Sequence, residues 1–288
     1  MPELPEVEVV KRSLKNSIKD LTIKKMTINS NKLRYEIKKR DFNKIINKKI
    51  LSIKRRSKYL LIILSRGLTI LVHLGMTGKF FIVNEKGKKS KTSFYYQINN
   101  KDHKHDHIIF HFNKNKRLIY NDIRKFGFIK IISSTNLKKN LHLKFLGPEP
   151  LSEKFNLKYF KKNIINKKKK LKDTLMDQKF VSGLGNIYVN EILFLSKLNP
   201  TKATKSLKSA DMLKILHFTK KILKKSIKTG GSSIKNFKDS YGESGKFQQL
   251  FNVYAREGEK CTKNKCGGII KKSNISNRSS FFCSTCQK

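Results

Sequence analysis

The chain has 288 residues, and its 66 lysines and arginines against 20 aspartates and glutamates give a formal charge of +46. This length favours two domains, and the positive charge predicts nucleic-acid phosphate as the partner. Lysine, asparagine and isoleucine are used heavily throughout, so coding bias contributes to the charge and only its sign identifies the partner. No apolar run approaches the ~20 residues that cross a bilayer, and the acidic N-terminus does not read as a signal peptide, so we expect a soluble intracellular protein.

The first eight residues, MPELPEVE, place a proline second in the chain. Removal of Met1 would leave Pro2 as a free secondary amine close to the carboxylates of Glu3 and Glu6. An α-amino group titrates near ~8, against ~10.4 for lysine, so at neutral pH it can attack an electrophilic carbon such as a sugar C1′. The same residues also suit an ordinary helix start, in which proline occupies the first turn and acidic side chains face the helix dipole. Both interpretations stay open at this point.

One helix and then a series of strands are predicted for the first half of the chain. Apolar residues Val7, Val10 and Leu14 recur at helical spacing and predict a helix over 5–17. Short alternating or wholly apolar runs bounded by turn residues then predict seven strands, over 49–55, 59–64, 68–73, 80–84, 107–112, 117–121 and 128–132. Seven such runs suggest a β-sandwich or a flattened barrel.

The second half changes to helices after a boundary rich in polar and turn-forming residues. The segment 133–140 is polar and basic, and Gly147, Pro148 and Pro150 follow it, so we place the domain boundary between about 133 and 151. Apolar residues at helical spacing then predict helices over 155–164, 171–176, 186–197 and 206–229. The segment between Gly230 and Gly245 is rich in glycine and serine and predicts a flexible loop around one short helix.

All four cysteines lie in the last 28 residues, as Cys261, Cys266, Cys283 and Cys286. In a reducing compartment, two close pairs separated by a longer arm predict a four-thiolate, tetrahedral zinc site on paired hairpins rather than disulfides. The alternative is four unrelated buried cysteines. A four-thiolate site leaves no open position for catalysis, so the zinc would be structural.

Two further segments suit phosphate contacts. In VSGLGNIYVNE, Gly183 and Gly185 stand immediately before Asn186 and an amphipathic helix, so backbone N–H groups and the helix dipole would face a phosphate at that turn. Glycine turns are common, however, and this pattern alone is weak. Arg278 lies near the tip of the arm between the cysteine pairs, where its guanidinium can grip a phosphate or the edge of an extruded base. An ordinary surface arginine is the alternative.

With these segments in view, the chain resembles the bacterial formamidopyrimidine-DNA glycosylase family along essentially its whole length. The order and spacing of several motifs carry the resemblance, rather than any one of them. They are MPELPEVE at the start, RRSKYLL at 55–61, HLGMTGKF at 73–80, NDIRKFGF at 121–128, LGPEPL at 146–151, LMDQKFVSGLGNIYVNE at 175–191, TGGSS at 229–233 and the cysteine hairpin.

The resemblance implies an α+β protein, in which an N-terminal β-sandwich with an N-terminal helix precedes a helix-two-turns-helix domain and a zinc-finger hairpin. The expected divisions are a catalytic domain over 1–135, a linker over 136–151, a helix-two-turns-helix DNA-binding domain over 152–240, and a lesion-covering loop with the zinc finger over 241–288. The implied activity is that of a bifunctional DNA glycosylase and AP lyase of base excision repair. Such an enzyme excises 8-oxoguanine and formamidopyrimidines from duplex DNA through a Schiff base, followed by β- and δ-elimination.

The resemblance also assigns catalytic roles to matching residues. Pro2 would be the Schiff-base nucleophile at C1′, and Glu3 the acid that protonates the sugar ring oxygen. Lys58 would be a cation near the phosphate and sugar of the damaged nucleotide, and Glu6 a supporting carboxylate. Arg278 would hold phosphate at the site from the zinc hairpin.

A damaged base inside the stack is out of reach, so such an enzyme must flip the nucleotide and fill the space that it leaves. By resemblance, Met76 and Phe126 form apolar wedges and Arg124 donates to the orphaned cytosine. Read alone, Met76 and Phe126 would be taken for core residues. Asn186 would grip the backbone beside the lesion, and the remaining expected phosphate contacts are His73, Lys172 and Tyr254. The loop 241–247 would cover the flipped base.

One departure from the family stands in the tail, where four residues rather than two separate the first two cysteines. It leaves the class of site unchanged, with one structural zinc as the only expected cofactor. We expect a monomer that binds damaged double-stranded DNA and no membrane, in the bacterial cytoplasm and associated with the nucleoid. Two alternatives remain: an endonuclease VIII-like glycosylase for oxidised pyrimidines, and a non-catalytic DNA- or RNA-binding protein that keeps the fold.

Overall fold

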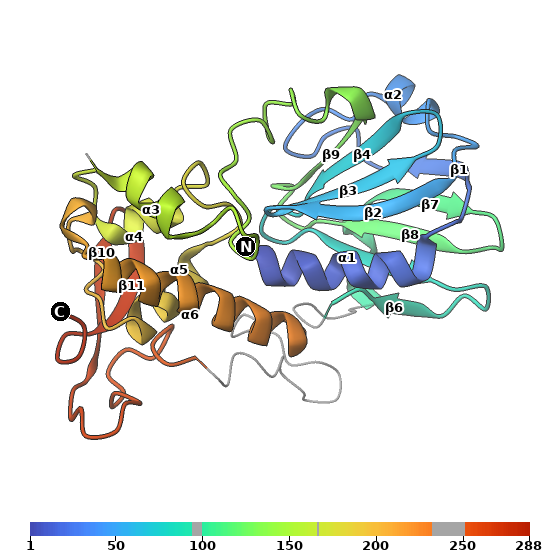
Figure 1. The fold of residues 1–288 in the computed structure, drawn as a ribbon. Helices are drawn as coiled ribbons and strands as arrows, with labels where there is room; N and C mark the ends of the chain where they lie inside the picture. The colour runs from blue at the N-terminus through green and yellow to red at the C-terminus, as the bar shows by residue number, and fades with distance from the viewer. Residues whose placement is uncertain (94–99, 166, 232–250) are drawn as a thin grey trace. The chain divides into compact units, whose positions relative to one another are not determined.

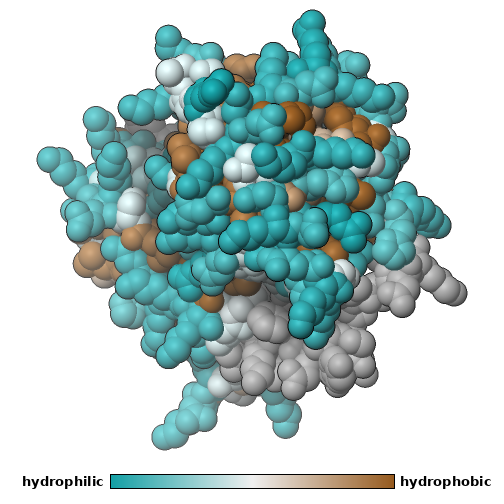
Figure 2. Space-filling view, turned by 90° about the vertical axis from the view of Figure 1, so that its right-hand side faces the viewer, coloured by the Kyte–Doolittle hydropathy of each residue, from teal (hydrophilic) through white to brown (hydrophobic). Residues whose placement is uncertain are grey.

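The computed structural model describes residues 1–93, 100–165, 167–231 and 251–288 (Figure 1). These residues divide into two compact units. The first contains residues 1–144 and 229–231, and the second contains 145–228 and 251–288. Figure 2 shows one face of the protein, where hydrophilic side chains cover most of the visible surface and hydrophobic ones show between them.

The first unit is a β-sandwich preceded in the chain by an N-terminal helix, as expected from the sequence. One sheet has the strand order β1-β7-β8-β5-β6 and the other the order β2-β3-β4-β9, with all paired strands antiparallel. The bounds are α1 Leu4–Ile18, β1 Ile23–Ile28, α2 Lys39–Asn43, β2 Ile50–Arg56, β3 Tyr59–Leu64, β4 Leu68–His73, β5 Lys79–Val83, β6 Lys89–Lys91, η1 Asn100–His105, β7 Asp106–Phe112, β8 Arg117–Asn121, β9 Phe128–Ser133 and η2 Ser134–Asn136.

One hydrophobic core joins α1 to the two sheets. Val7, Val10 and Leu14 lie on the buried face of α1, at the three- and four-residue spacing that one face of a helix requires. They belong to the same cluster as Leu60 of β3 and Phe80 of β5. The position of the first turn of α1 is therefore determined by packing along the helix, which matters because that turn carries the amino end.

The second unit is helical and ends in a two-stranded hairpin. Its elements are α3 Leu157–Ile164, α4 Leu171–Met176, α5 Asn186–Leu195, η3 Thr204–Ser206, α6 Ser209–Lys228, β10 Ile270–Ile275 and β11 Arg278–Cys283. The buried helix α5 contacts α4, α6 and β11. Its Glu191 carboxylate accepts backbone N–H bonds from Asn252, Val253 and Tyr254, each at 2.9 Å, and so anchors the segment before the hairpin.

The structure differs from the expected elements at several points. The third helix begins at Leu157 rather than 155 because the Asn156 side chain accepts from Tyr159 N and caps it. Strands β1 and β6 and helix α2 were not expected from the sequence. The short helix expected between 230 and 245, and the loop 241–247, lie outside the described residues.

The division into domains at 135, 151 and 240 stays a prediction. Among the described helices, none is long and apolar enough to span a membrane.

Candidate active site and zinc centre

The amino end is held by a reciprocal pair of carboxylates. Glu3 is the residue before α1, and its backbone N donates to Glu6 Oε2 at 2.8 Å while its side chain accepts from the Glu6 backbone. This capping box satisfies two donors that would otherwise lack partners at the start of a helix. Glu3 and Glu6 are each only 3% exposed, and Pro2 is buried beside them. The fold therefore brings two buried carboxylates to the residue expected to be the nucleophile.

Lys58 is presented by a tight turn between β2 and β3. Ser57 has a φ of 55°, which lets two residues reverse the chain, and the Lys58 side chain is buried. Arg55 braces this turn because its Nη1 donates to the Ser57 carbonyl while its Nε donates to Glu8 Oε2 of α1, both at 2.9 Å. Burial alone would raise the pKa of Glu8, but hydrogen bonds from Lys11 and Arg55 outweigh it and lower that pKa. Glu8 thus stays anionic and ties the Lys58 turn to α1.

The charges around the amino terminus act on its protonation. Burial lowers the pKa of the Met1 amino group; Glu3 and Glu6 oppose the shift, while Lys58 and Arg124 reinforce it. The charges of four residues singled out in the sequence thus act on one amine, and all four belong to the first unit. A lowered pKa leaves more of an amine unprotonated at neutral pH, which is the form that attacks carbon.

Gly231, from the TGGSS segment, packs against Glu6. Its φ of 87° is in the left-handed region, and a Cβ atom there would lie 3.2 Å from Glu6 Oε1. Glycine therefore allows this later segment to approach the buried carboxylate. The sequence marked the motif, but its partner became visible only in the folded chain.

The three residues expected to enter the DNA stack face solvent. Met76 is 42% exposed and Phe126 is 47% exposed, so the interpretation of these two as core residues is wrong. The Arg124 guanidinium lies 4.6 Å from the centroid of the Phe126 ring. Exposed apolar side chains beside a cation are suited to contact with bases, although their role in this chain stays a prediction.

His73 ends strand β4 in an aromatic environment. Its ring lies 5.0 Å from that of Tyr59 and is stacked on Phe128 at 5.7 Å, and its Nδ1 accepts from Gly75 N at 3.1 Å. Burial first, and then the positive charges of Lys58 and Arg34, lower the pKa of His73 to about 4. At neutral pH the ring is uncharged and carries its proton on Nε2, so it can meet a phosphate as a hydrogen-bond donor but not as a cation.

The lowered pKa of His73 predicts a loss of stability in acid. The unfolded chain takes up the proton below about pH 6.5, whereas the folded chain resists it down to about 4, so the stabilisation is complete above 6.5 and falls with pH. Replacing His73 with glutamine should reduce the loss in the free energy of unfolding between pH 7.5 and 5 by about 2 kcal/mol. Urea unfolding at both pH values measures it. An identical loss in the variant would contradict the assignment.

In the second unit, Asn186 and Lys172 bind the zinc hairpin. Asn186 is the first residue of α5, and its Nδ2 donates to the Ser279 carbonyl at 2.8 Å. Lys172 is buried, with Nζ 2.5 Å from Ser280 Oγ. Burial lowers the pKa of Lys172 to about 8, with Asp173 opposing the shift and Arg278 adding to it. Both residues orient β11, and their phosphate contacts stay predictions.

Arg278 and Tyr254 lie on and beside the same hairpin. Arg278 is exposed and directly follows the turn Ser276–Asn277, whose φ values of 50° and 59° reverse the chain at the tip expected from the sequence. Tyr254 is half-buried, with its ring edge-on to Phe281 at 5.2 Å. The tip of the hairpin therefore presents a guanidinium to solvent, whereas Tyr254 packs beneath it.

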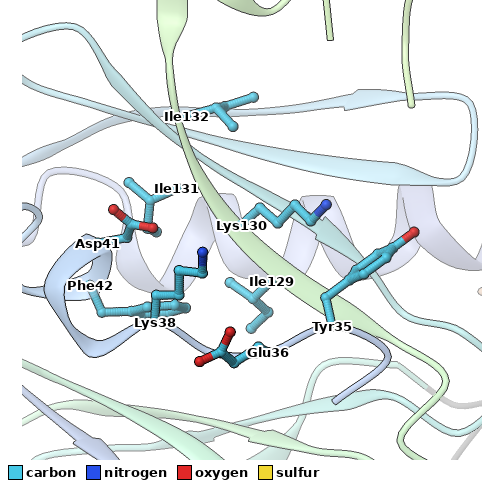
Figure 3. A pocket seen from close by; sticks show the side chains of 9 residues that line it. All are labelled: Tyr35, Glu36, Lys38, Asp41, Phe42, Ile129, Lys130, Ile131 and Ile132. Atoms are coloured by element: carbon cyan, nitrogen blue, oxygen red, sulfur yellow. The ribbon is translucent and has the colours of Figure 1, made fainter. Parts of the chain in front are cut away.

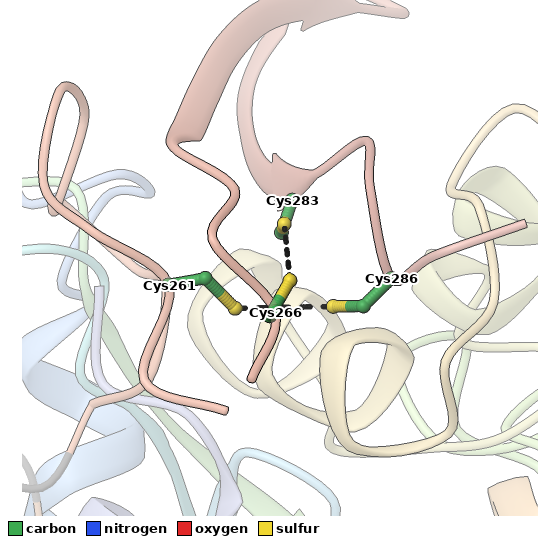
Figure 4. Close-up of side chains that lie close together, drawn as sticks. All are labelled: Cys261, Cys266, Cys283 and Cys286. Carbon is green, nitrogen blue, oxygen red and sulfur yellow. Dashed lines mark hydrogen bonds between the residues drawn. The ribbon is translucent and has the colours of Figure 1, made fainter. Parts of the chain in front are cut away.

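The four cysteines form one cluster (Figure 4). Their sulfur atoms lie within 4.8 Å of one another, with Cys261 Sγ 3.9 Å from Cys286 Sγ and Cys266 Sγ 3.6 Å from Cys283 Sγ. Tetrahedral zinc with Zn–S bonds of ~2.3 Å requires sulfurs ~3.8 Å apart, so the cluster fits one ion. Lys265, in the longer loop between the first two cysteines, and Gly267, just after that loop, both have positive φ. The structural zinc site predicted from the spacing is confirmed.

A separate hollow of about 370 Å³ lies along the edge of the sandwich (Figure 3). Strand β9 lines it on one side and the segment 35–42 on the other. Its side chains belong to Tyr35, Glu36, Lys38, Asp41, Phe42, Ile129, Lys130, Ile131 and Ile132. None of Pro2, Glu3 or Lys58 is among them, so this hollow does not belong to the chemistry of the amino end.

Sequence reasoning missed two residues, Asp122 and Thr77. Asp122 is buried and Thr77 is half-buried, and both lie close in the chain to the exposed Met76, Arg124 and Phe126. Their only signal was their place inside NDIRKFGF and HLGMTGKF, where an aspartate and a threonine look like ordinary turn residues.

Comparison with known proteins places these features in one class. Three family models match in order: a formamidopyrimidine-DNA glycosylase N-terminal domain over residues 1–129, its H2TH domain over 146–238, and a zinc finger found in FPG and IleRS over 258–288. Fold and site thus define a zinc-finger DNA glycosylase. The chain belongs to the formamidopyrimidine-DNA glycosylase family.

Individual relatives match over full length. The chain is 38% identical to a formamidopyrimidine-DNA glycosylase of Rickettsia bellii and 37% identical to one of Rhodopseudomonas palustris, with all of each chain covered. Among solved structures, the Lactococcus lactis Fpg in complex with DNA containing an abasic site is 34% identical, with 99% of each chain covered and a TM-score of 0.85. The Lactococcus lactis FPG in complex with FAPY-dG DNA is also 34% identical, with 99% of this chain covered, 100% of that one, and a TM-score of 0.84.

Proposed function

We propose that this protein is a bifunctional DNA glycosylase and AP lyase that excises oxidised purines, including 8-oxoguanine and formamidopyrimidines, from duplex DNA. One observation carries the proposal: Pro2 is buried beside the buried carboxylates of Glu3 and Glu6, and the charges of Lys58 and Arg124 act on the same amino end. Family membership and the DNA-bound relatives support the substrate. The setting is base excision repair.

The proposed chemistry begins after removal of Met1. The Pro2 nitrogen attacks C1′ of the everted nucleotide and forms an N–C1′ bond as the bond from C1′ to the base breaks, and the proton that the nitrogen loses balances the one that the departing base takes up. Glu3 gives its proton to the sugar ring oxygen, which lets the ring open to an iminium. Glu6 supports Glu3 through the capping box, and Lys58 balances the charge of the adjacent phosphate. Elimination at the β and then the δ position removes the sugar and leaves a gap of one nucleotide.

The proposed DNA contacts come from both units. Met76, Arg124 and Phe126 fill the space left by the lesion, and Arg124 donates to the orphaned cytosine. Asn186 and Arg278 hold phosphates, with His73, Lys172 and Tyr254 as further contacts. The loop 241–247, which would cover the base, lies outside the described residues. The protein would act as a monomer on nucleoid DNA in the cytoplasm.

Lesion choice tests the proposal against its alternatives. With 8-oxoguanine opposite cytosine and thymine glycol opposite adenine in otherwise identical duplexes, release of 8-oxoguanine should be at least about tenfold faster. Borohydride added during turnover should link the protein covalently to the 8-oxoguanine strand, because only an imine can be reduced to a stable amine. Faster thymine glycol release would instead identify an endonuclease VIII-like enzyme. Tight binding with no release and no covalent link would identify a non-catalytic binding protein.

A further inference from the structure

The two loops that carry the exposed wedge residues are in direct backbone contact. Gly75 has a φ of 62°, and a Cβ atom there would collide with the backbone of Phe126 and Gly127. A Cβ atom on Gly127 would in turn meet the Tyr120 hydroxyl and the His73 carbonyl. Glycine at both positions lets the loop 74–77 and the loop 122–127 pack with no side chain between them.

A single carboxylate joins these loops. Asp122 Oδ1 accepts from the Thr77 hydroxyl at 2.5 Å, and its Oδ2 accepts from Gly127 N at 2.8 Å. The Thr77 oxygen itself accepts from Arg124 N at 3.0 Å. Tyr120 contributes a longer hydroxyl bond of 3.4 Å to Oδ2. One side chain from each loop therefore connects the whole pair, across 45 positions of sequence.

The energetic setting makes this arrangement sensitive to each donor. Asp122 has no exposed surface, and among the described residues no cation forms an ion pair with it. A buried carboxylate is costly unless hydrogen bonds replace its water, and here neutral donors alone do so. Burial first, and then the charge of Asp122, raise the pKa of Tyr120, so the phenol keeps the proton that it donates.

The three wedge residues, Met76, Arg124 and Phe126, each lie at or next to a residue held by these hydrogen bonds. Met76 immediately precedes Thr77, Phe126 immediately precedes Gly127, and the backbone N of Arg124 is itself bonded to Thr77. The three side chains face solvent while their backbones are held. The two loops are therefore already ordered before DNA binds. The entropic cost of ordering them is met during folding and does not weaken binding.

We propose that Asp122 and Thr77 are positioning residues that set the wedge loops in one register, so that Arg124 reaches the base opposite the lesion. This inference rests on the proposed role of Met76, Arg124 and Phe126 in filling the stack. The specificity at stake is discrimination of the orphaned base. Cytosine accepts where Arg124 donates, whereas adenine presents a different edge, and a displaced guanidinium would lose that distinction.

Opposite-base preference provides the measurement. Single-turnover excision of 8-oxoguanine is compared opposite cytosine and opposite adenine. Thr77→Val keeps the shape but removes the donor to Asp122 and the acceptor for Arg124 N, and should lower the cytosine-to-adenine rate ratio about fivefold or more. Thr77→Ser restores the hydroxyl and should stay within about twofold of the unmodified protein. Asp122→Asn cannot accept from both Thr77 and Gly127, and should resemble Thr77→Val.

Two further variants separate the possible failures. Thr69→Val removes another threonine hydroxyl, which bonds Ser134 Oγ at 2.8 Å in β4 away from the wedge, and should leave the ratio unchanged. Arg124→Ala should abolish the preference if the proposed insertion set is right. If Arg124→Ala loses the preference for cytosine while Thr77→Val and Asp122→Asn keep it, the positioning role of Asp122 and Thr77 is overturned and the insertion set stands. If Arg124→Ala keeps the preference for cytosine, both the insertion set and the positioning role of Asp122 and Thr77 are overturned.

A readout that does not depend on the wedge guards against general damage to the fold. Borohydride trapping on a single-stranded abasic oligonucleotide needs the amino end but no stack to fill. Thr77→Val and Asp122→Asn should be trapped on this oligonucleotide as efficiently as the unmodified protein. Only their cytosine-to-adenine rate ratio, measured in duplex DNA, should fall. If trapping on the single strand falls as much as excision from the duplex, Asp122 and Thr77 serve the fold in general rather than the wedge loops, and the inference is rejected. Should Thr77→Val not fold, Asp122→Asn decides the same question.

Discussion

Replacing Pro2 with glycine is expected to lower borohydride trapping on an 8-oxoguanine duplex by about 100-fold or more. Proline provides a secondary amine, whose adduct with a sugar aldehyde is a permanently charged iminium, and its ring limits rotation at the start of α1. Glycine leaves a primary amine on a freely rotating residue, and a displacement of the reacting atom by ~1 Å can cost 10²-fold. Duplex binding should persist, because it depends on phosphate contacts elsewhere.

Pro5→Gly is the matched control for this change. Pro5 lies in the first turn of α1, three positions further on, and its nitrogen is a peptide amide that cannot form an imine. This variant should keep its trapping even if the helix loses some stability. Equal trapping by Pro2→Gly and the unmodified protein would contradict the mechanism. So would mass spectrometry that finds Met1 still attached in protein that releases the lesion at full rate.

Removal of zinc, or replacement of Cys283 with alanine, is expected to unfold the hairpin and weaken DNA binding. The described cluster beneath the hairpin has only five buried hydrophobic members, of which Cys283 is one, so the metal substitutes for a core. Zinc contributes about 10 kcal/mol or more to the folding of zinc-finger peptides. Because Arg278 and the partners of Lys172 and Asn186 lie on this hairpin, affinity for a duplex with a stable abasic analogue should fall by about 100-fold.

Hydrogen exchange and a binding titration check this expectation together. Amides of β10 and β11 should lose protection on zinc removal, whereas those of α5 and α6 keep theirs. Asn264→Ala, at an exposed position in the loop between the first two cysteines, is the control and should change neither protection nor affinity. Protected hairpin amides in metal-free protein, or active protein purified without zinc, would refute a structural role for the ion.

The regular elements were largely predictable because their signals are local. Helix α4 spans Leu171–Met176, as its apolar spacing predicted, and the seven expected strands all appear within one residue of their predicted ends. Strand β1 was not predicted because two lysines in IKKMTI interrupt the alternation, and it forms through pairing with β7, 80 or more positions away. Strand β6 has only three residues, which is too few to show any period.

The candidate site was less predictable, because protonation and register depend on neighbours. His73 was expected only as a phosphate contact, yet burial, and then the positive charges of Lys58 and Arg34, lower its pKa and make it a neutral donor. Lys172 was likewise expected as a phosphate contact, yet its side chain is buried against the hairpin. Asp122 looked like an ordinary turn residue of its motif, because nothing in its own segment reveals a bond to Thr77.

The sequence by itself determined which chemical groups the protein has and their spacing along the chain. The proline beside two carboxylates, the four cysteines and the helical periods are covalent facts, so zinc binding and the main elements follow from short-range rules. Only the tertiary structure decided which of these groups meet. Gly231 reaches Glu6, and Thr77 reaches Asp122, because packing brings distant segments together and excludes water between them. Burial and charge then set protonation and orientation, which no local pattern encodes.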